Sequence, residues 1–110
     1  MADRKADKME QIERITVMED RLRRAEKAMG QLASALDEYE AVREDIGELD
    51  RYYGSREWRR DLEDDEAGRI PKDLPRGVLS EDGIYNLMAD ERELMDRMRE
   101  LATDADGIMV

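Results

Sequence analysis

The chain contains no cysteine, no histidine and no phenylalanine among its 110 residues. Without cysteine and histidine it has no disulfide framework, no zinc-finger ligand set, no thiol nucleophile and no imidazole for acid–base catalysis. The serines therefore lack a histidine partner, and the acidic residues do not follow the spacing of a calcium-binding loop. We expect a protein that is not an enzyme and that needs no metal and no cofactor. Catalysis by carboxylates alone is the remaining alternative.

Positive charge is also in short supply, since 30 residues are acidic and 19 are basic, for a net charge of −11. Binding to a phosphate backbone requires an excess of lysine and arginine, so direct contact with nucleic acid is not expected. The densest basic patch, Arg21 to Lys27, is interleaved with acidic residues, which indicates ion pairs within and between helices. Residues 1–29 are nearly balanced in charge, whereas residues 30–53 and 80–110 are acidic.

Long apolar runs are absent as well. The longest uncharged stretch, Ala28 to Leu36, is far shorter than the roughly 20 apolar residues that cross a bilayer. The first residues lack the basic start and the apolar core of a signal peptide. Anionic lipid surfaces should repel an acidic chain. The sequence thus predicts a cytoplasmic protein that does not bind membranes.

The apolar residues that are present recur in a heptad pattern. From Ile15 to Tyr53 they follow one another at steps of three and four residues, which is typical of a helix in a coiled coil. The pattern predicts a helix over residues 9–53, and we expect any bend at Gly30 or Gly47. The predicted seam consists of Leu22, Met29, Leu32, Leu36, Val42, Ile46 and Leu49.

Two shorter helices are expected after the long one. Gly54 should end the first helix, Ser55 is a suitable N-cap, and the second helix is predicted over residues 56–67, with Gly68 as its stop.

Both prolines of the chain lie in the following loop, residues 69–79. Ser80 then precedes a third helix over residues 81–102. We expect an all-α, elongated antiparallel hairpin in a single helical domain, residues 9–102. We expect residues 1–8 to be a polar, disordered lead and residues 103–110 to be a frayed tail.

The few aromatic residues cluster around the predicted first turn. Tyr52, Tyr53 and Trp58 lie within seven positions of each other. Because adjacent helical residues point about 100° apart, the two tyrosines cannot face the same seam. One of them should pack with Trp58 and fix the second helix to the first. Such a corner is either purely structural or a surface that binds a partner. The candidate residues are Tyr52, Tyr53, Trp58, Arg76, Asp82 and Tyr85.

Two motifs carry a resemblance to a known family. They are YYGS-x-x-W, from Tyr52 to Trp58, and LPRGVLSEDGIY, from Leu74 to Tyr85. On these motifs the chain resembles a bacterial family described as domain-of-unknown-function family 4298, over residues 9–101. The resemblance implies a small bacterial helical protein, and it implies no activity, ligand or site residue.

The sequence therefore predicts a non-enzymatic protein–protein interaction module. It would form a homo-oligomer, or act as an adaptor for an unidentified protein partner, through an apolar seam that salt screens little. The alternative is an acidic decoy that mimics a phosphate backbone and inhibits a nucleic-acid-binding protein. The carboxylates of residues 38–50 and 81–100 would then face outward, and binding would be sensitive to salt.

Overall fold

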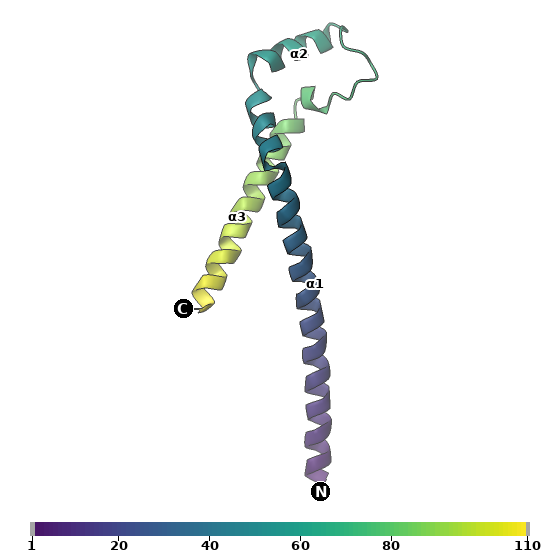
Figure 1. Cartoon of the computed structure of the whole chain (residues 1–110), viewed down its shortest axis with the longest axis vertical. Helices are drawn as coiled ribbons and strands as arrows, with labels where there is room; N and C mark the ends of the chain where they lie inside the picture. The colour runs from purple at the N-terminus through teal and green to yellow at the C-terminus, as the bar shows by residue number, and fades with distance from the viewer. Residues whose placement is uncertain (1, 110) are drawn as a thin grey trace. The chain divides into compact units, whose positions relative to one another are not determined.

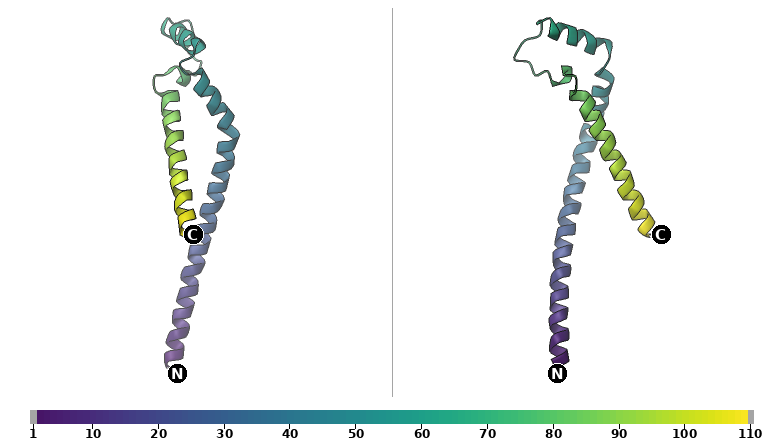
Figure 2. Two further views of the ribbon diagram at one scale, coloured as in Figure 1. Left: turned by 90° about the vertical axis from the view of Figure 1, so that its left-hand side faces the viewer. Right: turned by 180° about the vertical axis from the view of Figure 1, so that it is seen from behind.

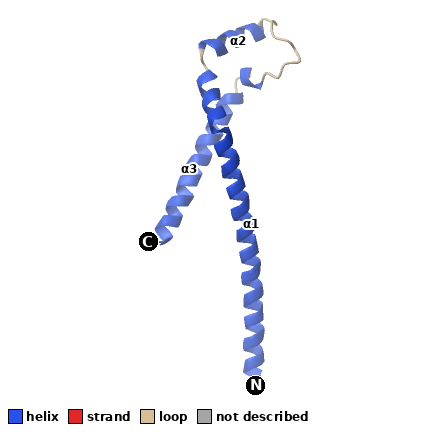
Figure 3. Ribbon diagram, viewed as in Figure 1, coloured by secondary structure: helices blue, strands red, loops and turns tan. Residues whose placement is uncertain are grey.

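The computed structural model describes residues 2–109 of the chain. They form three α-helices, α1 (Ala2–Tyr52), α2 (Arg56–Glu66) and α3 (Gly83–Met109), and one short 3₁₀ helix, η1 (Gly77–Leu79) (Figures 1 and 3). The fold is 84% helical, and no strand occurs among the described residues. The predicted all-α class, with a long helix followed by two shorter ones, is confirmed.

The chain divides into two compact units, where the sequence predicts a single domain over residues 9–102. The N-terminal unit is Met1–Val42 and the C-terminal unit is Arg43–Val110. The N-terminal unit consists of helix α1 alone, without a second element to pack against within the unit. The C-terminal unit contains the last turns of α1 together with α2, η1 and α3.

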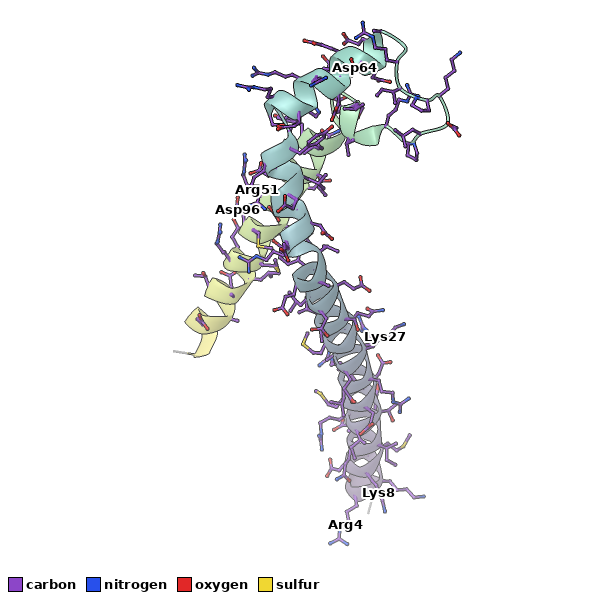
Figure 4. All side chains as sticks on the ribbon, turned by 45° about the horizontal axis from the view of Figure 1, so that its top comes forward. Arg4, Lys8, Lys27, Arg51, Asp64 and Asp96 are labelled. Atoms are coloured by element: carbon purple, nitrogen blue, oxygen red, sulfur yellow. The ribbon has the colours of Figure 1, made fainter. Side chains whose placement is uncertain are left out.

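Helix α1 begins at Ala2 rather than at residue 9, so residues 2–8 are helical and not a disordered lead. This segment contains no glycine or proline, and its alanines, lysines and arginine are strong helix formers. The helix also continues through Gly30 and Gly47 without a break. In Figure 4 the side chains of α1 project outward around the helix, with Lys8 and Lys27 pointing into solvent.

The two ends of α2 are fixed by local hydrogen bonds. Gly54 takes a φ of +78°, which releases the chain from α1, and the Ser55 hydroxyl accepts a bond from the Trp58 backbone N–H at 3.2 Å. At the other end, Gly68 has a φ of +75°. The Gly68 N–H bonds the Asp65 carbonyl and the Arg69 N–H bonds the Asp64 carbonyl, which is a Schellman motif.

The chain then returns toward the last turns of α1, where α3 begins (Figure 2). Helix α3 starts at Gly83, two residues later than expected, because residues 77–79 form the 3₁₀ turn η1. It extends to Met109, so residues 103–109 are helical and not frayed. Its Ile84 is only 3% exposed and is the one buried apolar side chain among those described.

Candidate functional site

The aromatic corner lies in the C-terminal unit, where α1 turns into α2. The rings of Tyr53 and Trp58 meet edge to face, with centroids 5.1 Å apart and planes at 69°. The Trp58 indole Nε1–H donates to the Val78 carbonyl at 2.9 Å. Trp58 therefore connects α2 both to Tyr53, the residue directly after α1, and to η1, which lies 20 residues further along the chain.

Tyr52 points to a different partner from its neighbour. Its hydroxyl donates to the Asp61 carboxylate at 2.5 Å, which joins α1 to α2 a second time. Burial, together with the hydrogen bond and the negative charge of Asp61, raises the pKa of Tyr52 to about 12. The phenol thus stays protonated and remains a hydrogen-bond donor throughout the physiological pH range. The prediction that the two tyrosines face different sides is consistent with these contacts.

Arg76 holds the loop between α2 and η1 in place. Its guanidinium forms an ion pair with Asp65 of α2, whose side chain is 18% exposed. The same guanidinium donates to the Pro71 carbonyl at 2.7 Å, and its Nε–H lies 3.5 Å from the Leu74 carbonyl. A single arginine therefore binds the helix and two points of the loop that follows it.

Helix α3 begins in close contact with the backbone of η1. A Cβ atom on Gly83 would lie 2.3 Å from the Gly77 carbonyl oxygen and 2.8 Å from the Ser80 Oγ. The Ser80 hydroxyl donates to the Gly77 carbonyl at 2.6 Å and accepts from the Gly83 N–H at 3.1 Å. Only glycine fits at position 83 because of this approach, and Ile84 then enters the core next to it.

A shallow apolar depression of about 360 Å³ lies beside this contact. It is formed by the last turns of α1, the loop, η1 and the start of α3. The residues that line it are Leu49, Pro75, Gly77, Val78, Gly83, Ile84 and Leu87.

The predicted corner residues separate into two groups. Tyr52, Tyr53, Trp58 and Arg76 are brought together by the contacts above. Asp82 is exposed and contributes its backbone carbonyl, which accepts from the Asn86 N–H in the first turn of α3. Tyr85 is 62% exposed.

Sequence reasoning missed the acidic partners Asp61 and Asp65 and the role of Gly83. The spacing of nine residues between Tyr52 and Asp61 carries no recognisable signal. The recurrence of glycine at 77 and 83 around a turn was the one available hint of a close backbone approach.

The residues of the predicted seam are divided between the two units and differ in exposure. Ile46 and Leu49 are half-buried in the C-terminal unit, whereas the apolar side chains in the N-terminal unit are open to solvent. Ile15 is 54% exposed, Leu22 53% and Leu36 41%. We call the following residues the apolar stripe: Ile12, Ile15, Met18, Leu22, Met29, Leu32 and Leu36. Val42, at the end of the same unit, is exposed too.

Among the side chains that the structure describes, those of residues 4–106, no three acidic groups come together in an arrangement that could hold a metal ion. None of the described helices combines the length and the apolar run needed to cross a bilayer. The corner has hydrogen bonds and an apolar depression, and its polar groups are engaged with one another.

Comparison with known proteins identifies a family. No curated protein and no solved structure matches the chain significantly. The model of the family described as "Domain of unknown function (DUF4298)" matches residues 15–101, which include both motifs and every contact of the corner. Since the match covers most of the sequence, the chain belongs to the DUF4298 family.

Proposed function

We propose that this protein is a non-enzymatic protein–protein interaction module and that the apolar stripe is its binding surface. The observation that supports the proposal is the exposure of the stripe. Seven large apolar side chains on one helix, spaced for a coiled coil, remain between 41% and 60% exposed. Such a continuous apolar surface is typical of an interaction site rather than of a monomer's outer face.

The energetics of the stripe agree with this role. Full burial of one leucine or isoleucine side chain is worth about 1.5–3 kcal/mol, so a partner helix along the stripe would gain several such contributions. The N-terminal unit contains no other element, and an isolated helix depends on packing for most of its stability. The corner in the C-terminal unit would then support the fold, since its polar groups already have partners within the chain.

The test is native mass spectrometry of the tagged chain, purified gently from its own host cells. We expect a mass larger than one chain. Leu32→Asp should return the protein to a single chain, because a charge would have to be buried in the seam without a partner. The matched control is Ser34→Asp, which adds the same charge two residues away on the outward face of the helix. Circular dichroism verifies that both variants remain helical.

Two results would contradict the proposal. One is a wild-type protein of single-chain mass in its own cells. The other is an assembly that Leu32→Asp leaves intact, because the stripe would then have no part in it. An assembly that dissociates readily in moderate salt would instead favour the acidic decoy.

A further inference from the structure

We propose that a second copy of this chain covers the apolar stripe, parallel to the first and in register with it. This inference rests on the proposed function and adds the identity and the orientation of the partner. The evidence for it is the pattern of charged residues that border the stripe.

The stripe can be read as heptads with positions a to g, in which a and d form the seam. Positions a are Ile15, Leu22, Met29 and Leu36, and positions d are Met18, Ala25, Leu32 and Tyr39. The charged residues next to the seam are then positive on one edge and negative on the other. Arg14 and Arg21 occupy position g on one edge, and Glu19 and Glu26 occupy position e on the other.

These charges specify an orientation. In a parallel pair, position g of one helix meets position e of the next heptad in the partner. Arg14 would meet the second copy's Glu19, Arg21 would meet its Glu26, and the twofold symmetry repeats both pairs. In an antiparallel pair each edge meets the same edge of the other copy, so arginine would face arginine and glutamate would face glutamate. Like charges placed opposite each other disfavour that arrangement.

The charged residues are available for such contacts. Among the described side chains of residues 4–106, no ion pair involves Arg14, Arg21 or Glu26. Glu19 lies 4.0 Å from Arg23, but both side chains are more than half exposed, so the pair is weak and exchangeable. The residues beside the seam further along, Ala28, Ala33 and Ala35, are small and would allow close packing of two helices.

Helix α3, over its described length, is too short to cover the whole stripe. Leu49 of α1 and Ile84 of α3 line the same depression, and α3 ends at Met109. Both helices rise by the same distance per residue, and Met109 lies 25 residues after Ile84. An α3 that ran antiparallel along α1 from Leu49 would therefore end beside about residue 24 of α1. The N-terminal portion of the stripe, residues 12–22, lies beyond that point, together with the edge residues Arg14, Glu19 and Arg21.

The test exchanges charges between the edges in the purified full-length chain. In the acidic-edge variant, Arg14→Glu and Arg21→Glu make both edges negative. In the edge-swapped variant, Glu19→Arg and Glu26→Arg are added, so that the edge that was positive is negative and the edge that was negative is positive. We expect the dissociation constant of the acidic-edge variant to rise by about tenfold or more, since four attractive pairs become repulsive. The edge-swapped variant should associate as tightly as the wild type.

A mixture of wild type and edge-swapped chains tests the orientation. Parallel pairing predicts that the two chains separate into their own dimers, because a mixed parallel pair would place like charges opposite each other. Native mass spectrometry of an isotope-labelled mixture measures this. The control for net charge is Arg24→Glu with Lys27→Glu, on the outer face of the helix, which should associate normally.

Cysteine provides an independent measurement, because the chain has none. Gln11 occupies position d near one end of the seam, so Gln11→Cys would place two thiols opposite each other only in a parallel, in-register pair. We expect a disulfide-linked dimer on mild oxidation, whereas Lys27→Cys on the outer face should not form one.

Several outcomes would overturn the inference. Mixed dimers in excess would establish antiparallel pairing, and an acidic-edge variant that associates normally would show that the edges do not matter. A purified wild type that stays a single chain would exclude a second copy as the occupant. If that same chain forms a Leu32→Asp-sensitive assembly in its own cells, the proposed function stands and only the identity of the partner changes.

Discussion

At the scale of single residues, Gly83 is the one described glycine with atoms within 4 Å of the position that a Cβ would take. Gly83→Ala would force its new methyl group against the Gly77 carbonyl, 2.3 Å away, so η1 and α3 would have to separate. We expect a loss of about 1–3 kcal/mol in the free energy of unfolding, as for other overpacked sites. Urea denaturation followed by the fluorescence of Trp58, the single tryptophan, measures this change close to the contact.

Gly47→Ala is the matched control for that measurement. Gly47 lies within α1 in the same unit, and no atom lies within 4 Å of the position that its Cβ would take. Alanine should therefore stabilise the helix by about 0.5–1 kcal/mol. A Gly83→Ala protein as stable as the wild type would mean that the close approach of the two backbones does not exist.

At the scale of elements, the loop between α2 and η1 depends on one side chain. Arg76→Ala would remove the ion pair with Asp65 and the bond to the Pro71 carbonyl. Asp65 would remain mostly buried without its partner, and we expect a loss of about 1–2 kcal/mol, visible as a lower melting temperature. Arg69→Ala is the control. Its ion pair with Asp64 is 3.0 Å long, but the arginine is 70% exposed, so the stability should barely change.

Arg76→Ala also distinguishes the two interpretations of the corner, as a structural support or as a surface that binds a partner. A less stable protein that still assembles normally would make the corner structural. An unchanged melting temperature with weaker assembly would make it a docking surface. If Arg76→Ala altered neither property, the corner would have no specific role.

The elements themselves could be predicted from local sequence signals. Gly54, Ser55 and Gly68 act within four or five residues of their own position, and the two prolines exclude a helix from the loop. The outer ends of α1 and α3 could not be placed as well. The polar residues 2–8 are compatible with either helix or coil, and Gly107, a residue that often ends a helix, lies within α3.

The corner contacts were less accessible to prediction because they join distant positions. The clustering of Tyr52, Tyr53 and Trp58 indicated that one of the two tyrosines would pack with Trp58, and in the structure it is Tyr53. The bond from Trp58 to the Val78 carbonyl and the choice of Asp65 as the partner of Arg76 depend on how η1 folds back, which no local pattern encodes. Several acidic residues in α2 were equivalent candidates in the sequence.

At the scale of the whole molecule, the two units should respond differently to dilution. If the stripe of the N-terminal unit is covered by a second copy, its helix should melt at a lower temperature as the chain concentration falls. The C-terminal unit has its own contacts, so the transition seen by Trp58 should change little. Far-ultraviolet circular dichroism and tryptophan fluorescence, recorded on the same dilution series, measure the two responses. Identical, concentration-independent transitions would contradict this expectation.

The glycines of the corner also determine which substitutions evolution can accept there. Glycine is favoured at positions 54 and 68 because φ is positive there. Their Cβ positions are open, so asparagine, which also adopts the left-handed region, is an acceptable replacement at both. Gly83 is required for space, and no side chain of any kind fits. Among sequences that keep this corner, glycine-to-asparagine exchange is therefore compatible with positions 54 and 68, whereas variation at position 83 would identify a lineage in which η1 and α3 have moved apart.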